Sequence, residues 1–368
     1  MSSPQGGYIA PPKPGTVPLR PLGVGELLDG SFQTIRRNAA AMIGSSVLLK
    51  LLSTIITTIC LALLAGPSLN TLLTASTLGS RSNSSLPQLG TLLAGVGISS
   101  LLSVVLTLII GTLLQGLQAI PVMRGTLNQK TRFGLLWRLA KPTLWKLILL
   151  GLFYAVALLI GMGVVVGVAY LTFSAGGVPV GFPVTIILAL AAITLAVWVG
   201  NKIALAPAVM AVEGAGVGQA LRRSWRLTDR NFWRVLGMLL LAGLIASVIG
   251  SIVTTPLSLV LGLLTPVVAP SMDTSGAVTA ALALQAMNIA IASLVSAITS
   301  AFQTGVLALL YADLRIRKEG LDLQLLKELE DLSLQAQYGA PAGTVPERIP
   351  GSAAPSAESA PSDYRTVP

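Results

Sequence analysis

The sequence predicts an all-α membrane protein with six transmembrane helices, arranged as three repeated units of a cytoplasmic amphipathic helix plus a helical hairpin. The chain of 368 residues is 53% hydrophobic and only 10% charged, and its mean hydropathy is +0.79. A soluble chain of this length needs more charged residues to cover its surface, so the composition excludes an ordinary soluble globular protein. The apolar stretches and an internal similarity predict the rest of the architecture.

Each predicted span is an apolar stretch long enough to cross the hydrocarbon core of a bilayer. About 20 helical residues, each rising about 1.5 Å, cover about 30 Å of hydrocarbon. Six stretches meet this requirement: residues 40–65, 92–121, 146–173, 182–211, 234–264 and 280–311. The outer connections are then residues 66–90, 174–181 and 265–279, and none is long enough for an external catalytic domain.

The two ends of the chain differ from the middle in composition. Residues 1–22 repeat Pro and Gly and lack an apolar core, so we expect a disordered cytoplasmic tail and no cleavable signal peptide. Residues 337–368 are rich in Ala, Pro and Ser and predict a second disordered cytoplasmic tail. Residues 23–336 then form the membrane domain, with the six spans and the interfacial helices.

Basic residues gather on one side of the predicted spans. Of the 24 lysines and arginines, 21 fall in the two termini or in the connections after the second and fourth spans, and only Arg81 falls in an outer connection. Cytoplasmic loops carry the excess of Lys and Arg, so both termini of this multi-pass protein are predicted to be cytoplasmic. The net charge of +10 follows from this topology and from attraction to anionic headgroups. It therefore does not indicate a nucleic-acid partner.

Three segments of the chain are similar to one another. Residues 23–44 (GVGELLDGSFQTIRRNAAAMIG) and 216–237 (GVGQALRRSWRLTDRNFWRVLG) share eight of 22 positions without a gap. A third segment, residues 137–148 (WRLAKPTLWKLI), has four identities with residues 225–236. Each segment precedes a span that leads outward, which predicts a threefold internal repeat about an axis along the membrane normal. Chance similarity between basic helices is the alternative.

The repeated segments alternate aromatic and aliphatic residues with arginine and lysine. This is typical of helices that lie in the headgroup plane and extend their cations into water. Four of the five tryptophans fall in these segments, which predicts an interfacial belt on the cytoplasmic side. The candidate anionic-lipid surface consists of Arg36, Arg37, Arg138, Lys141, Arg222, Arg223, Arg226 and Arg230. Plain anchoring at the interface, without recognition of a headgroup, is the alternative.

Polar residues recur on single faces of several predicted spans. Ser46, Lys50, Ser53 and Thr57 follow one another at spacings of 4, 3 and 4, which places them on one side of a helix. Lipid cannot satisfy such groups, so we expect them to face inward. The candidate intramembrane polar site consists of Lys50, Ser46, Ser53, Thr57, Asn201, Lys202, Asn288 and Gln303.

The two lysines are the most costly members of that candidate site. A lysine at the centre of a span costs about 2.5–3.5 kcal/mol on insertion scales. Each lysine therefore either binds an anionic headgroup or substrate in a cavity, or reaches the interface, or pairs with carbonyl and hydroxyl oxygens. The interface is nearer for Lys202 than for Lys50. Small residues at spacings of three or four, such as Gly163 and Gly167, predict close helix packing within the chain, in preference to homodimerisation.

The sequence lacks the residues of the commonest catalytic and metal sites. It contains no histidine and a single cysteine, Cys60, in an apolar stretch. Histidine is the usual general base and metal ligand, and one cysteine makes neither an intrachain disulfide nor a zinc cluster. We therefore expect no catalytic residues, no metal site and no cofactor. A serine–lysine hydrolase pair has no recognisable nucleophile or oxyanion hole.

A resemblance to a known family rests on three stretches. These are residues 21–38 (PLGVGELLDGSFQTIRRN), 207–237 (PAVMAVEGAGVGQALRRSWRLTDRNFWRVLG) and 311–323 (YADLRIRKEGLDL). They resemble bacterial membrane proteins named after the membrane domain of glycerophosphoryl diester phosphodiesterase, over about residues 18–336. Proteins that gave the family its name carry a fused catalytic barrel with histidines and acidic metal ligands. This chain lacks both the histidines and the length, so the resemblance implies the architecture without the activity.

Together these observations predict a non-enzymatic integral protein of the bacterial cytoplasmic membrane that interacts with lipids or serves as a partner or scaffold for other proteins. The expected partners are membrane lipids with anionic headgroups. A short amphipathic helix over residues 319–334 would bind a membrane or cytoplasmic protein, or dock on the bundle itself. The alternative is a transporter or lipid flippase with a polar intramembrane cavity around Lys50 and Lys202.

Overall fold

The computed structural model is all-helical over the residues that it describes: 20–77, 85–268 and 274–321, together with Pro18, Leu323, Leu325 and Lys327. The first three helices are α1 (Val24–Arg37), α2 (Ala39–Thr77) and α3 (Ser85–Thr126). They are followed by α4 (Phe133–Ile203), α5 (Ala206–Glu213), α6 (Val217–Thr228), α7 (Phe232–Val268) and α8 (Thr274–Glu319). The all-α prediction is thus confirmed for this part of the chain.

Five stretches in the described residues are long and apolar enough to cross a membrane. They are Ala39–Leu64, Ala94–Thr126, Phe133–Glu213, Phe232–Leu264 and Ala283–Glu319. Four of them coincide, within a few residues at most boundaries, with the first, second, fifth and sixth predicted spans. The third and fourth predicted spans both fall within Phe133–Glu213.

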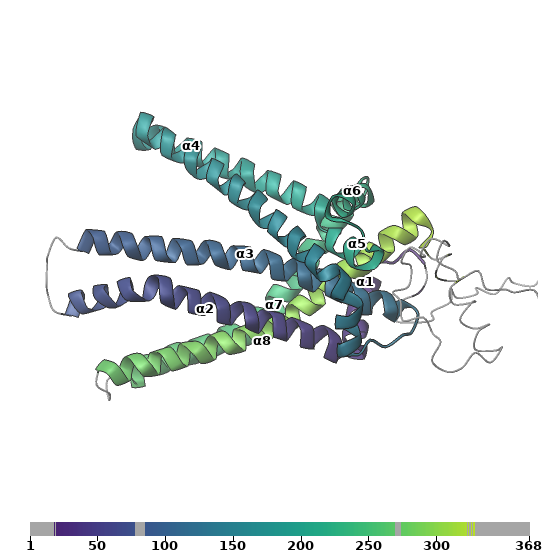
Figure 1. Cartoon of the computed structure of the whole chain (residues 1–368), viewed down its shortest axis with the longest axis horizontal. Helices are drawn as coiled ribbons and strands as arrows, with labels where there is room; N and C mark the ends of the chain where they lie inside the picture. Colours follow the sequence, from purple (N-terminus) through teal and green to yellow (C-terminus); the bar gives the residue numbers. More distant parts are fainter. Residues whose placement is uncertain are drawn as a thin grey trace, which may run out of the picture.

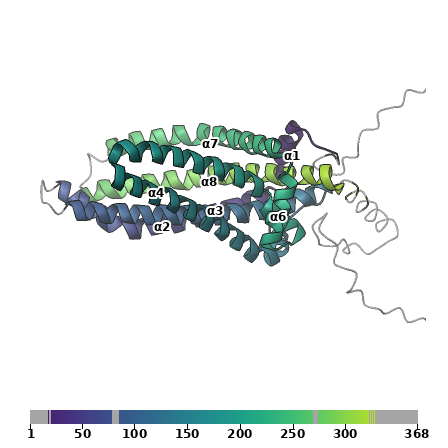
Figure 2. The ribbon, with the colours of Figure 1, turned by 90° about the horizontal axis from the view of Figure 1, so that it is seen from above.

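A glycine divides α4 into two arms. Gly177 has φ 63° and ψ −166°, a conformation that interrupts the helix and that residues with a Cβ rarely adopt. The arms lie side by side (Figure 2), and the Tyr154 hydroxyl donates a hydrogen bond to the carbonyl oxygen of Ile203 at 3.0 Å. A Cβ on Gly181 would lie 2.6 Å from the ring of Phe173, so the arms are already close at the turn. The α4 segment is therefore a helical hairpin.

The short helices lie at one end of the bundle. Figure 1 shows α1, α5 and α6 at this end, which we call the α6 end, and the long helices diverging from it. The buried core also lies here, since it includes the last residues of α3, all of α5 except its final glutamate, and the second half of α8. Helix α8 contacts α1, α2, α3 and α7, so it holds these four helices together.

Away from the α6 end, the long helices expose large apolar side chains. Examples are Ile59 on α2, Ile160 and Ile187 on the two arms of α4, and Ile252 on α7. Water would not favour such a surface, whereas hydrocarbon would. The expected close packing at Gly163 and Gly167 is wrong within the described chain, because a Cβ added at either glycine would meet no atom within 4 Å.

The predicted limits of the domain and of the connections need correction. Leu22, assigned to the N-terminal tail, is buried against the core, so the folded domain begins before residue 23. The helices α2 and α3 extend into residues 66–90, which were predicted as a connection: α2 continues to Thr77 and α3 begins at Ser85. Residues 1–17 and 337–368, the remainder of both predicted tails, lie outside the described residues.

The predicted helix over residues 319–334 is described only at alternate positions after Gly320. Gly320 has φ 63° and ends α8, and Leu321, Leu323, Leu325 and Lys327 are helical. Leu321 and Leu325 are buried in the core, while Leu323 is exposed. The described leucines at 321 and 325 thus dock on the bundle itself.

Candidate functional site

Six of the eight residues predicted as an anionic-lipid surface have exposed side chains. They lie on α1, on the first part of α4, on α6 and directly after α6, all at the α6 end of the bundle. The six are Arg36, Arg138, Lys141, Arg222, Arg226 and Arg230. Exposed cations therefore occupy the end from which the apolar helices extend.

The other two members of that predicted surface hold the fold together. Arg37 donates hydrogen bonds to the side chain and the carbonyl oxygen of Asn128, in the turn after α3. Arg223 forms ion pairs with Glu213 and, at 2.7 Å, with Glu319. Neither guanidinium is free for a ligand in this arrangement.

The ion pairs of Arg223 belong to a network that joins the α5–α6 turn to α8. The Tyr311 hydroxyl donates to Glu213 at 2.6 Å and accepts from Arg315 at 3.3 Å, and Arg315 pairs with Glu319 at 3.2 Å. Alternating charges in this network satisfy one another, as buried and half-buried charges require. The spacing of Arg315 and Glu319 along one helix is compatible with their pairing, whereas the sequence gives no sign that Tyr311 and Glu213 join them.

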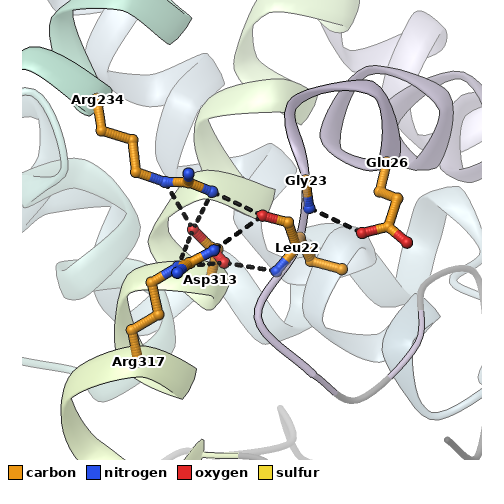
Figure 3. Close-up of polar contacts among 6 residues, drawn as sticks. All are labelled: Leu22, Gly23, Glu26, Arg234, Asp313 and Arg317. Carbon is orange, nitrogen blue, oxygen red and sulfur yellow. Dashed lines mark hydrogen bonds and ion pairs between the residues drawn. The ribbon is translucent and has the colours of Figure 1, made fainter.

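A second network surrounds the carboxylate of Asp313, which is 0% exposed. Figure 3 shows Arg234 from α7 and Arg317 from α8 on this carboxylate, with nitrogen-to-oxygen distances of 2.9 to 3.2 Å. The amide of Leu22 donates to the same carboxylate at 2.8 Å, and the carbonyl oxygen of Leu22 accepts from both arginines. Asp313 therefore joins three parts of the chain that are far apart in sequence. We call this group of four residues the Asp313 clamp.

Lys202 and Asn201 make their contacts at the α6 end. The Lys202 ammonium donates to Asp229 at 3.1 Å and lies 5.3 Å from the ring centroid of Trp225. This ammonium lowers the pKa of the Asp229 carboxyl below its ordinary value, through their hydrogen bond and then through their charges. The Asn201 amide donates to the carbonyl oxygen of Phe232 at 3.0 Å. Lys202 thus connects the end of α4 to the loop after α6, and Asn201 connects it to the first residue of α7.

Ser46 belongs to a buried polar cluster between three helices. The Gln118 amide of α3 donates to the Ser46 hydroxyl of α2 at 2.6 Å, and the Thr304 hydroxyl of α8 donates to the Gln118 carbonyl oxygen. All three side chains are buried. Because the polar atoms satisfy one another, the cluster can lie among apolar side chains.

The remaining members of the predicted polar site do not join this cluster. Lys50, Ser53, Thr57 and Asn288 are half-buried, and Gln303 is exposed. The Thr57 hydroxyl donates to the carbonyl oxygen of Ser53 at 2.8 Å, a bond within α2. Gln303 precedes the buried Thr304 by one residue, which turns its side chain by about 100° around α8. The eight residues predicted as one intramembrane polar site therefore lie in several separate places and do not form a single site.

Among the described residues, no group of three or more His, Cys, Asp or Glu side chains is arranged to hold a metal ion. Each carboxylate described in the structure instead accepts a hydrogen bond from a neighbouring group, as the two networks above illustrate. The described chemistry at the α6 end is thus that of cations, either paired with carboxylates or exposed.

The fold and this surface have the length, the apolar exposure and the charge distribution of a helical integral membrane protein, and this is the class that they define. Residues 63–314 match the model of a family described as a domain of unknown function, DUF7847. The match covers more than half of the chain, so the protein belongs to this family. No curated protein and no solved structure matches the chain.

Proposed function

We propose that the protein is an integral protein of the bacterial cytoplasmic membrane that binds anionic lipid headgroups at its α6 end. The observation that carries the proposal is the set of six exposed cations at the end of a bundle whose long helices expose apolar side chains. Cations near the surface of an anionic leaflet each contribute about 1 kcal/mol of attraction. The α6 end would then face the cytoplasmic leaflet.

Two tryptophans support this placement of the membrane surface. Trp233, at the start of α7, is 80% exposed, and Trp145, near the start of the apolar part of α4, is 67% exposed. Indole rings favour the headgroup level, where one edge is apolar and the other is wet. Both rings lie in the segments that carry the exposed cations, as expected for an interfacial belt.

The proposal includes six crossings with both termini in the cytoplasm. The hairpin of α4 supports it, because two arms in place of one make the number of crossings even. The threefold repeat is supported at α1 and α6: each begins at an extended glycine, Gly23 or Gly216, whose amide donates to Glu26 or Gln219 three residues later. The third segment, residues 137–148, differs because it lies inside α4 without a break.

The role that we propose is non-enzymatic, as a lipid-binding unit or a membrane scaffold. The engagement of Glu213, Asp313 and Glu319 in ion pairs between helices supports a structural role for these carboxylates. The burial of Leu321 and Leu325 favours docking of the last helix on the bundle over binding of a protein partner. The likeness to the phosphodiesterase membrane-domain family stays a prediction.

The alternative, a transporter or lipid flippase with a cavity around Lys50 and Lys202, receives less support. Lys202 donates to Asp229 at the α6 end, outside the apolar part of α4, so its charge is already neutralised by a carboxylate of the chain. Lys50 alone is left for a role inside the membrane.

Loss of exposed arginines on α6 is expected to reduce the preference for anionic lipid. Arg222 and Arg226 lie one turn apart and are exposed, so the double substitution Arg222→Gln and Arg226→Gln removes two cations without breaking an ion pair of the fold. At about 1 kcal/mol per cation, the preference for phosphatidylglycerol over phosphatidylcholine should fall by up to about fivefold per residue. The measurement is native mass spectrometry of lipids retained after extraction from mixed bilayers.

Arg81→Gln is the control for this experiment, because the sequence predicts that cation on the opposite side of the membrane. It should leave the lipid preference unchanged. An unchanged preference in the double variant would contradict the proposed lipid surface.

The proposed topology predicts which residues can be labelled from outside the cell. In a Cys60→Ala background, single cysteines replace Gln88, near the start of α3, or Gln219, on α6. A membrane-impermeant maleimide should label position 88 in intact cells and position 219 only after permeabilisation. Labelling of both positions from the same side would overturn the three crossings that the proposed topology places between them.

A further inference from the structure

Lys50 has no carboxylate partner available in the apolar part of the chain. The sequence contains no aspartate or glutamate between Asp29 and Glu213, which covers the first four predicted spans. The fifth and sixth predicted spans, residues 234–264 and 280–311, contain none either. Any acidic partner would therefore have to come from a connection or from the α6 end.

The carboxylates at the α6 end are already engaged with other groups. Glu213 and Glu319 pair with Arg223, Asp229 pairs with Lys202, and Asp313 pairs with Arg234 and Arg317. Glu26 pairs with Arg20, and Asp29 accepts from the Gln33 amide. Within the described part of the chain, no carboxylate is left over for Lys50.

Lys50 also lies deeper than Lys202. It follows the first residue of α2 by 11 positions, which corresponds to about 16 Å along the helix. Side chains on a helix point back toward its N-terminus, and a lysine spans only about one turn, so the ammonium ends short of the level of Ala39. Lys202, by contrast, reaches Asp229 beyond the end of its arm.

The surroundings of Lys50 are partly open to lipid. Its side chain is half-buried and makes no hydrogen bond or ion pair with the residues described. One turn earlier, Ser46 faces α3 through Gln118, while Leu48 and Leu52, on either side of Lys50 in the sequence, are exposed. A lipid lying against α2 can thus place its acyl chains on exposed leucines and its headgroup toward the ammonium.

We propose that Lys50 binds the phosphate group of a membrane phospholipid, held against α2 below the ordinary headgroup level. A charged ammonium inside a span needs a counter-charge, and a phosphodiester supplies one in the absence of a carboxylate. This inference rests on the proposed membrane function. It adds a single, deeper lipid site to the surface defined by the exposed cations.

The test compares wild-type protein with Lys50→Met and Lys50→Arg after extraction from phosphatidylglycerol bilayers. Native mass spectrometry should find one tightly held phospholipid fewer on Lys50→Met, with a loss of affinity of about tenfold or more, and the same number on Lys50→Arg. Methionine removes a charge from an apolar span, so the variant should insert and fold at least as well as wild type. Size-exclusion chromatography checks this.

Equal numbers of retained phospholipids on wild type and Lys50→Met would overturn the inference. Inorganic phosphate is tested in a separate arm, by thermal unfolding of lipid-depleted protein in detergent. Phosphatidylglycerol should raise the unfolding temperature of wild type by more than that of Lys50→Met, which keeps the exposed cations of the α6 end, and inorganic phosphate should raise neither. If inorganic phosphate raised the unfolding temperature as much as the lipid does, the ligand of Lys50 would be a soluble anion and not a phospholipid. Failure of the surface proposal would appear instead in the Arg222→Gln and Arg226→Gln variant, in which Lys50 is intact.

Discussion

Substitution of Asp313 by asparagine is expected to lower the free energy of unfolding by about 3–5 kcal/mol. The Asp313 carboxylate is fully buried between Arg234 and Arg317, and it also accepts the amide of Leu22. Asparagine keeps the size of the side chain but removes the negative charge and one acceptor. The two guanidinium groups would then lie close together without a counter-charge, which is the costly way to break a buried ion pair.

The measurement is reversible unfolding by sodium dodecyl sulfate in mixed micelles, with Asp29→Asn as the control. Asp29 is exposed on α1 and, among the residues that the structure describes, accepts only from Gln33, so its loss should cost less than about 1 kcal/mol. Hydrogen exchange adds a local readout, since the amide of Leu22 should exchange faster in Asp313→Asn but not in Asp29→Asn. Equal stability of the two variants would show that the Asp313 clamp does not hold the α6 end together.

Composition and apolar length predicted most of the fold. The apolar stretches alone located the long helices, because a span requires about 20 apolar residues whatever it packs against. The turn between the two arms of α4 fell inside the predicted connection at residues 174–181, where Gly177 supplies the positive φ that the turn requires. The ungapped similarity of residues 23–44 to residues 216–237 also predicted two helices, α1 and α6, that begin in the same way.

The candidate sites were harder to predict, because pairing depends on which helices meet. The spacing of Asp313 and Arg317 along one helix predicts their contact, but nothing in the sequence indicates that Arg234 and Leu22 reach the same carboxylate. Likewise, Ser46 was singled out from its face on α2, while its partner Gln118 became evident only from the packing of α2 against α3 and α8. Arg222 is exposed, whereas its sequence neighbour Arg223 is ion-paired with Glu213 and Glu319. The two differ in the side of α6 on which their side chains lie, which the sequence alone does not fix.

The approach of α3 to α4 gives the other large expected effect. Gly151, on the first arm of α4, faces the backbone of Ile109 on α3, and an ideal Cβ there would lie 2.6 Å from the Ile109 Cα atom and 2.6 Å from the Thr112 hydroxyl oxygen. The same hydroxyl donates to the carbonyl oxygen of Leu147, one turn before Gly151. The glycine thus allows a contact between helix backbones that a methyl group would prevent.

Gly151→Ala is therefore expected to be less stable than Gly163→Ala by about 1–3 kcal/mol in the same unfolding experiment. Both glycines lie on the first arm of α4, and both variants gain whatever alanine contributes to helix formation, so the difference isolates the steric term. A Cβ at Gly163 meets no atom within 4 Å. Backbone atoms of α3 cannot rotate away as a flexible side chain can, so the helices themselves must separate in Gly151→Ala. Equal stability of the two variants would mean that α3 and α4 are farther apart in the membrane than this packing requires.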